Sequence, residues 1–238
     1  LTQAQAAAEI GVSRPLLIAV EKGSREPTPA ELVKLAALYR RPLSELLRPA
    51  EPPVAIGARF RAALASAPRS SEIEESISAL ERSADDYLDL LRRSGSSLPG
   101  HYPAVRPPDG LGTTVAAENL ALSERNRLGL GDGPVDRLRE SLEIEVGLRI
   151  FVLPLPGQIA GLFVFVDPLG GCVAVNSKHP RERRRWTMAH EYAHLIAHRN
   201  RPEVTELPGR KRLSETERFA DAFAANFLMP RSGLVRRF

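Results

Sequence analysis

Residues 187–198 read Thr-Met-Ala-His-Glu-Tyr-Ala-His-Leu-Ile-Ala-His, a run that fits a helix spanning about residues 181–198. His190 and His194 are four residues apart, which on an α-helix is a rotation of about 40° and a rise of about 6 Å. Both imidazoles therefore face one point, where a single cation can bind them. Glu191 lies beside that face, where its carboxylate can take a proton from water on the cation. This arrangement is typical of a zinc hydrolase, and a surface helix that carries two histidines and a glutamate is the alternative.

A catalytic zinc ion needs a third protein ligand and an open position for water. His198 lies about 12 Å along the helix from His190, so we interpret it as a histidine at the helix terminus rather than a ligand. The acidic candidates that follow are Glu203, Glu206, Glu215, Glu217 and Asp221.

The spacing of the last predicted helix, residues 214–228, favours one of these candidates. Glu217 and Asp221 share a face with two alanines that allow close helix approach, whereas Glu215 points elsewhere. We therefore expect Glu217 to be the third metal ligand, although an exposed helix carboxylate is the alternative. Asp221 is expected to accept a hydrogen bond from the outer nitrogen of a ligating histidine. Zinc is the expected ion, with manganese possible in its place.

The composition is that of a folded chain with room for two small domains or one large one: 238 residues, of which 43% are hydrophobic. The longest apolar stretch, residues 159–175, is interrupted by Asp167, Pro168 and three glycines, and no secretory leader opens the chain. We therefore expect a cytoplasmic protein that makes no membrane contact. Cys172 is the only cysteine, which excludes disulfides within the chain and leaves histidine and carboxylate as metal ligands.

The net charge of +4 is unevenly distributed along the chain. Residues 178–212 contain ten Lys and Arg against four Glu, an excess of six. A surface for nucleic acid or for an acidic partner is one interpretation of this excess, and a solvated helix face with basic loops is the one we favour.

The chain is predicted to have an α+β fold in three parts. Residues 1–50 form an all-α helix-turn-helix domain, residues 51–113 a linker with a long helix at about 71–93, and residues 114–238 a domain with a short β-sheet packed on helices. The long helix is predicted to open at Ser71, with Glu74 completing a capping box, and to close at Gly95. Its apolar residues follow a heptad pattern, which indicates either a homodimer contact or packing on the chain's own C-terminal domain. They are Ile73, Ile77, Leu80, Ala84, Tyr87 and Leu91.

The third part is expected to alternate between helices and hairpin strands. Two helices are predicted at about 116–128 and 134–146, followed by strands at 148–153, 159–166 and 171–175 and by the two helices described above. An extended substrate could add as a strand to the edge of the hairpin at 159–175. Candidates for stabilising the reaction's oxyanion are Tyr192, His179 and His198, each of which has a structural alternative.

The stretch from Val175 to His194, together with Glu217-Arg-Phe-Ala-Asp-Ala-Phe-Ala-Ala-Asn-Phe-Leu-Met-Pro230, closely resembles the ImmA/IrrE metallopeptidases. The resemblance covers roughly residues 114–230. It implies a gluzincin-like zinc site in which His190, His194 and Glu217 are ligands and Glu191 is the base. It also implies that the substrate is a protein, in particular a transcriptional repressor cleaved in response to stress.

Residues 1–47 resemble the helix-turn-helix of XRE-type repressors, beginning at the second helix of that module. Gly11 would supply the turn and Ser13 would cap the helix that enters the major groove. The polar contacts to DNA would come from Gln3, Ser13, Arg14 and Lys22. Leu16, Ile18 and Ala19 occupy positions where a DNA reader usually carries polar side chains, so a dimerisation or sensing role is the alternative.

Two hypotheses about function follow. The first is a zinc-dependent endopeptidase that cleaves a repressor and itself binds DNA. The second is a DNA-binding regulator whose peptidase-like domain senses a ligand without turnover.

Overall fold

The computed structural model describes residues 2–47, 55–63, 70–96, 102–107, 112–207 and 213–236. The chain forms two compact units, Leu1–Pro52 and Pro53–Phe238, each with its own apolar core. Among the described helices, none is both long enough and apolar enough to cross a membrane.

The first unit is a small helical domain. Its helices are α1 (Gln3–Ile10), α2 (Arg14–Glu21), α3 (Pro29–Tyr39) and α4 (Leu43–Leu46). Gly11 ends α1 in the left-handed conformation, with φ of 76°, which turns the chain sharply into α2. Ser13 occupies the N-cap position of α2, but its side chain makes no capping hydrogen bond. The core of the unit is built by Ala6, Ala7, Ile10, Leu17 and Leu35.

The second unit confirms the predicted α+β class. Its helices are α5 (Ile56–Ala63), α6 (Ser71–Ser94), α7 (Thr113–Arg127), α8 (Leu138–Ser141), a π-helical turn η1 (Leu142–Val146), α9 (Arg181–Ala197), α10 (Glu215–Leu228) and α11 (Arg231–Val235). Its strands are β1 (Arg149–Leu153), β2 (Ile159–Val166), β3 (Gly170–Asn176) and β4 (Glu203–Glu206).

The four strands form one mixed sheet in the order β1-β3-β2-β4. β2 and β3 form the expected antiparallel hairpin, but β1 pairs in parallel with β3 rather than as a hairpin with β2. The sequence-based prediction missed β4, which pairs antiparallel with β2. Both edges of the β2–β3 hairpin are therefore occupied, so the prediction that a substrate adds to this hairpin is wrong.

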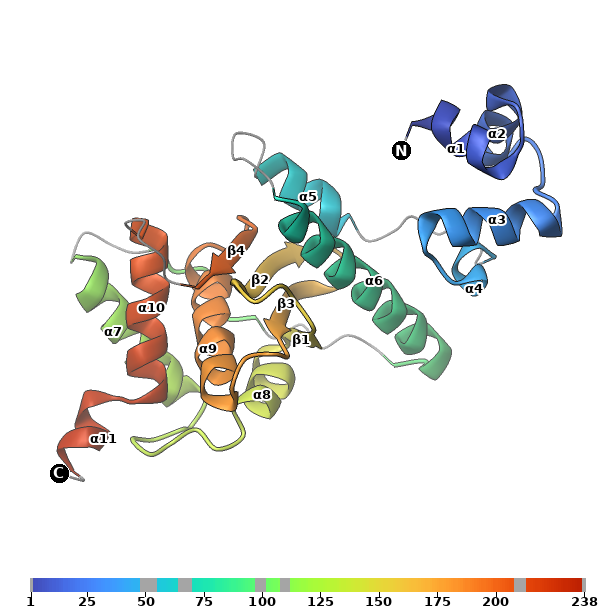
Figure 1. Cartoon of the computed structure of the whole chain (residues 1–238). Coiled ribbons are helices and arrows are strands. Elements are labelled where there is room, and N and C mark those ends of the chain that lie inside the picture. The colour runs from blue at the N-terminus through green and yellow to red at the C-terminus, as the bar shows by residue number, and fades with distance from the viewer. Residues whose placement is uncertain are drawn as a thin grey trace. The chain divides into compact units, whose positions relative to one another are not determined.

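Helices cover both faces of the sheet, as Figure 1 shows. Because side chains alternate along a strand, Phe163, Val173 and Val175 pack with α7, α9 and α10. Leu162 and Val164 point to the opposite face and pack with α5 and α6. This two-sided burial makes the sheet a rigid base for α9.

Helix α6 packs on the second face of the sheet. Leu80 and Ala84 are completely buried there, and Ile77 is 4% exposed. Of the two interpretations of the heptad pattern, packing on the chain's own domain is the one observed for Ile77, Leu80 and Ala84, and a homodimer contact through this helix stays a prediction. The N-cap is Ser70 rather than the predicted Ser71, since the Ser70 side chain accepts a hydrogen bond from the Ile73 N–H.

The predicted helix at 134–146 is shorter than expected. Regular helix begins only at Leu138, because Arg185 of α9 donates hydrogen bonds to the carbonyls of Val135 and Asp136. The last turn is a π-helix that ends at Gly147, with φ of 84°.

Arg125 ties α7 to the end of α10. Its side chain is 1% exposed and donates hydrogen bonds to the carbonyls of Gly131, Gly133 and Phe227. These bonds use the guanidinium donors and satisfy a carbonyl in the last turn of α10. The position of α10 is thereby fixed relative to α7.

Candidate metal centre

Helices α9 and α10 pack side by side (Figure 1), with alanines at their contact. Ala189 and Ala193 of α9 and Ala220 and Ala224 of α10 have no exposed surface. Small side chains let the two backbones approach closely. Ser214 caps α10 by accepting a hydrogen bond from the Glu217 N–H, which places Glu217 in the first turn of the helix.

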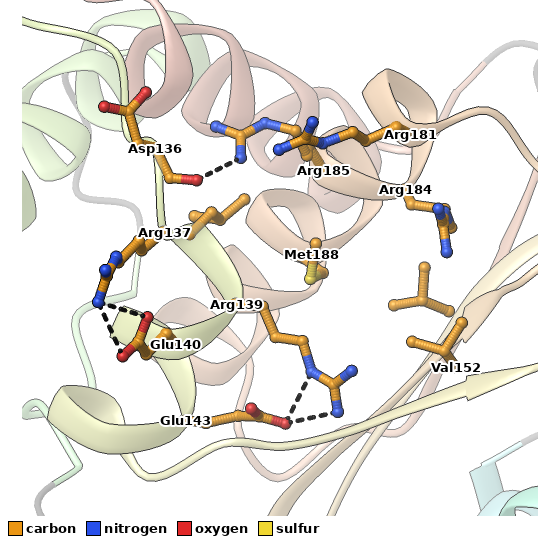
Figure 2. A pocket seen from close by; sticks show the side chains of 12 residues that line it. Asp136, Arg137, Arg139, Glu140, Glu143, Val152, Arg181, Arg184, Arg185 and Met188 are labelled. Atoms are coloured by element: carbon orange, nitrogen blue, oxygen red, sulfur yellow. Dashed lines mark hydrogen bonds and ion pairs between the residues drawn. The ribbon is translucent and has the colours of Figure 1, made fainter.

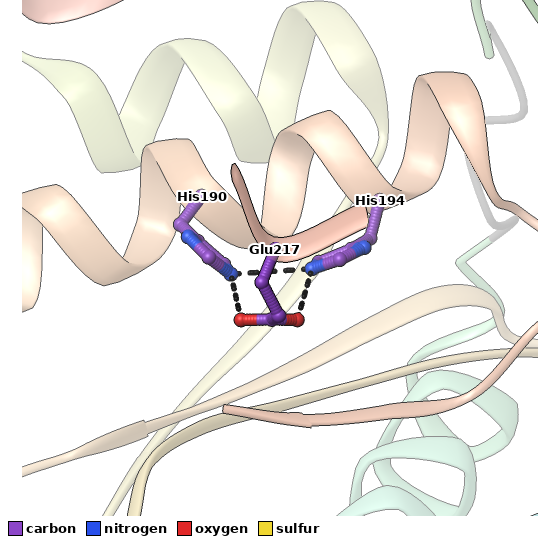
Figure 3. A group of neighbouring side chains, drawn as sticks. All are labelled: His190, His194 and Glu217. Atoms are coloured by element: carbon purple, nitrogen blue, oxygen red, sulfur yellow. Dashed lines mark hydrogen bonds and ion pairs between the residues drawn. The ribbon is translucent and has the colours of Figure 1, made fainter. Parts of the chain in front are cut away.

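This packing brings His190, His194 and Glu217 together (Figure 3). The two Nε2 atoms of the histidines lie 3.2 Å apart. Glu217 spans both imidazoles, with Oε2 at 3.3 Å from His190 Nε2 and Oε1 at 3.5 Å from His194 Nε2. Among the described residues, this is the cluster whose ligand atoms could hold one metal ion.

The separations of these atoms are close to those expected around one small ion. Ligand bonds of about 2.0–2.2 Å at tetrahedral angles place neighbouring ligand atoms about 3.3–3.6 Å apart. The separations in the cluster, with one Glu217 oxygen beside each histidine, lie within about 0.1 Å of that range. Two imidazoles and a carboxylate are also a donor set that zinc prefers, and the side chains need little movement to accept it.

Asp221 lies one turn along α10 from Glu217. Its Oδ1 accepts a hydrogen bond from His190 Nδ1 at 3.0 Å and another from Trp186 Nε1 at 3.4 Å. A proton held on Nδ1 leaves the lone pair of His190 Nε2 directed toward the cluster. The contact with Trp186 had no counterpart in the sequence-based interpretation.

The charges of the cluster are strongly coupled. Burial lowers the pKa of His190, but the carboxylates of Asp221 and Glu217 outweigh it and the pKa is raised to about 10. Burial lowers the pKa of His194 to about 4. Burial raises the pKa of Glu217, but hydrogen bonds from the two histidines reverse this effect and hold the pKa well below its usual value. Positive charge on the cluster thus stabilises Glu217 as a carboxylate.

Glu191 is completely buried beneath the cluster, between α9 and strand β2. Neither of its carboxylate oxygens has a hydrogen-bond partner among the described residues. Burial raises the pKa of Glu191 to about 8, against the opposing effects of His190 and Thr205. A β-carbon at Gly161 would lie 2.6 Å from Glu191 Oε1, so the carboxylate fits only because this position of β2 is glycine.

A cleft of about 180 Å³ gives access to the cluster from the side of β4. Its wall includes His190 and Glu217, with Thr205 and Glu206 of β4 opposite. Within the part of the chain that the structure describes, no strand pairs with the outer edge of β4. Strand β4 was difficult to predict because it has only four residues, and its β-branched pair Val204-Thr205 is flanked by glutamates.

The remaining acidic candidates lie outside the ligand cluster. Glu215 accepts a hydrogen bond from Thr113 and faces away. Glu203 forms an ion pair with Arg201 at 2.9 Å, and burial raises its pKa to about 7. Glu206 lines the cleft.

The three oxyanion candidates also differ in position. The Tyr192 hydroxyl donates to Glu124 and accepts from Arg127 inside the core, which removes it from the cleft. His179 contacts the carbonyl of Gly157 and does not line the cleft. The His198 ring lies 5.7 Å from the His194 ring, tilted by 51°, and meets Phe219 edge to face, which makes it a neighbour of the cluster.

The four candidate DNA contacts in the first unit are all exposed. Ser13, Arg14 and Lys22 lie on the surface around α2. Gln3 is exposed but donates a hydrogen bond to Glu21 at 2.7 Å, so it braces α1 against α2. Arg14 and Lys22 are the two cations of the predicted set.

Comparison with known families agrees with both halves of the structure. Residues 144–238 match the model of the IrrE N-terminal-like domain, and residues 1–46 match the model of a helix-turn-helix domain. No similarity to a curated protein or to a solved structure was found. The C-terminal part of the chain is thus similar to IrrE N-terminal-like peptidase domains, and the N-terminal part is similar to helix-turn-helix domains.

Proposed function

We propose that the chain is a zinc-dependent endopeptidase in which His190, His194 and Glu217 hold the ion and Glu191 is the general base. The observation that supports this most directly is the close approach of the two histidine Nε2 atoms and the Glu217 carboxylate, with one carboxylate oxygen beside each imidazole. Manganese is a possible substitute because it also accepts imidazole and carboxylate ligands.

The chemistry divides between the ion and the chain. Zinc supplies Lewis acidity, which lowers the pKa of water and polarises a peptide carbonyl. Glu191 takes the proton from the attacking water and delivers it to the departing amine. Its burial suits this task, because burial raises the pKa of Glu191 above its ordinary value and a more basic carboxylate takes a proton from water more readily. No covalent bond between enzyme and substrate is needed.

His190 is oriented for its role by Asp221. The hydrogen bond at 3.0 Å fixes the ring and its tautomer, so that Nε2 is free to bind the ion. His194 has no such partner among the described residues, since its buried Nδ1 makes no hydrogen bond. We therefore assign the main orienting contact of the site to Asp221.

The substrate is proposed to be a protein segment that adds to the outer edge of β4. Backbone hydrogen bonds to this edge would hold an extended peptide beside Thr205 and Glu206, which line the cleft. The resemblance to the ImmA/IrrE peptidases and the helix-turn-helix domain on the same chain favour a transcriptional repressor as the target.

The test is cleavage of candidate repressors by the purified chain loaded with zinc or manganese. We expect the wild type to cut at a defined site and Glu191→Gln to lose activity while retaining the metal. Glu215→Gln is the matched control, because it removes a carboxylate from α10 that lies outside the cleft. This variant should cleave the repressor at the wild-type rate. Equal cleavage by the wild type and Glu191→Gln would contradict the proposal.

The second candidate is a DNA-binding regulator whose peptidase-like domain senses a ligand without turnover. The helix-turn-helix match and the exposed Arg14 and Lys22 favour DNA binding in either case. A gel shift at stated salt should show weaker binding for Arg14→Ala combined with Lys22→Ala. The control is Arg93→Ala, which removes an exposed arginine from the other unit. Specific DNA binding without cleavage of any repressor offered would favour the sensor.

A further inference from the structure

A second cavity, of about 360 Å³, lies on the opposite face of α9 from the metal-ligand cluster. Its wall includes Arg184 and Met188 of α9, whereas Thr187 and His190 of the same helix line the metal cleft. It reaches β1, while the cleft reaches β4 at the other edge of the sheet. The two cavities share no residue, so the second is a separate site.

The wall of this cavity is basic. Five arginines line it against three acidic residues, which leaves an excess of two positive charges. Three of the arginines are already engaged, as the dashed lines in Figure 2 show. Arg137 pairs with Glu140 at 3.4 Å, Arg139 pairs with Glu143 at 3.0 Å, and Arg185 donates to backbone carbonyls.

Arg181 and Arg184 are the two arginines left over. Neither forms a hydrogen bond or an ion pair through its guanidinium with a described residue, and the Nε of Arg184 is buried without a partner. They lie three residues apart in the first turn of α9, a helix whose N-terminus has no side-chain cap.

The rest of the wall is apolar. Met188 lies between the charged groups in Figure 2, and Leu138, Val152 and Val175 complete the apolar part. The volume lies within the range of about 300–1,000 Å³ that is usual for small-molecule sites. Two free guanidinium groups next to an apolar surface match a ligand with an anionic head and an apolar body.

We propose that this cavity binds a small organic anion, whose phosphate or carboxylate group is held by Arg181 and Arg184 and whose apolar part packs on Met188. The two head groups share the same chemistry, because the guanidinium fork donates two parallel hydrogen bonds to either. This site is independent of the proposed peptidase reaction.

The test is calorimetric titration of the full chain, at constant ionic strength, with phenyl phosphate, benzoate and phenol. The two anions carry the same ring with different head groups, and phenol carries the ring alone. We expect saturable 1:1 binding of at least one anion and none of phenol. The tighter anion identifies the head group. Failure of both anions to bind, or equal binding of phenol, would overturn the proposal.

The site is then located with charge-neutralising variants. Arg181→Gln combined with Arg184→Gln should weaken anion binding at least tenfold, while the unfolding temperature of the free protein stays unchanged. Arg183→Gln is the matched control, since it removes an arginine from the same turn on the opposite face, and it should bind as the wild type does.

Two results from these variants would overturn the assignment: an unchanged affinity in the double variant, or an equal loss in Arg183→Gln. Titration of the wild type with an acidic peptide and with duplex DNA adds a third such result, which is binding confined to one of these two probes. Loss of anion binding in Glu217→Gln alone would place the anion at the metal cluster and overturn it as well.

Discussion

The side chain of Glu191 fits its buried position only because of its neighbour on β2. The carboxylate lies against Gly161, at a point where the pairing of β2 with β4 shifts register. A β-carbon there would approach Glu191 Oε1 and the Thr187 methyl group to 2.6 Å. Since Glu191 is the more flexible of the two, it is the group that would move.

Gly161→Ala is therefore expected to reduce repressor cleavage about 100-fold, because displacing a catalytic group by about 1 Å costs that much. Zinc content should stay at one ion per chain, since the three ligands are not displaced. The measurements are initial rates and metal analysis, with Gly157→Ala as control because no atom lies within 4 Å of a β-carbon there. Wild-type rates for Gly161→Ala would show that the general base lies elsewhere.

Asp221 offers a second prediction at the scale of one residue. Asp221→Ala removes the acceptor that orients His190, so zinc affinity should fall about 10- to 100-fold. Competition with a chelating dye measures this change, and Glu215→Gln should leave the affinity unchanged. An affinity equal to that of the wild type would mean that Asp221 does not support the site.

At the scale of elements, the helical spacing of residues was the most reliable basis for predicting the fold. It predicted the bounds of α9 and α10 to within one residue. The family model confirms the resemblance drawn from the sequence of these two helices. The arrangement of the strands was harder to predict, because turn residues identify a hairpin but carry no information about the parallel pairing of β1 with β3. The late start of α8 accompanies hydrogen bonds from Arg185, a residue far along the chain, to the carbonyls of Val135 and Asp136.

The heptad pattern of α6 was ambiguous for a physical reason. A helix that lies on a sheet buries one narrow stripe, and that stripe has the same spacing as a coiled-coil seam. Only the burial of Leu80 and Ala84 against β2 and β3 distinguishes the two cases.

Leu80→Ala is expected to lower the free energy of unfolding by about 2–5 kcal/mol, as for other buried leucines. Leu90→Ala, on the exposed side of the same helix at 65% exposure, should change it by less than about 0.5 kcal/mol. Denaturant unfolding measures both, and light scattering should give the same mass for each variant. A folded Leu80→Ala chain with half the molar mass of the wild type would instead support a homodimer contact through α6.

At the scale of the whole molecule, the two units are expected to respond differently to metal. Zinc at 100 times its Kd should stabilise the unit that contains residues 53–238 by about 2.7 kcal/mol. Removing it with a chelator should lower the unfolding temperature of that unit and leave operator binding by the first unit unchanged. Thermal unfolding and gel shifts with and without chelator check this. Loss of DNA binding on chelation would show that metal controls the first unit.

The hydrogen bond from Arg125 to the Phe227 carbonyl, in the last turn of α10, also has a consequence for biosynthesis. On the proposed ligand set, α9 leaves the ribosome with two ligands, and the third arrives with α10, whose end is held by a guanidinium placed about a hundred residues earlier. The nascent chain thus cannot complete the proposed metal site until α10 has left the ribosome and has packed against α9. On the proposed function, the chain therefore gains peptidase activity only after α10 has been synthesised and has folded against α9.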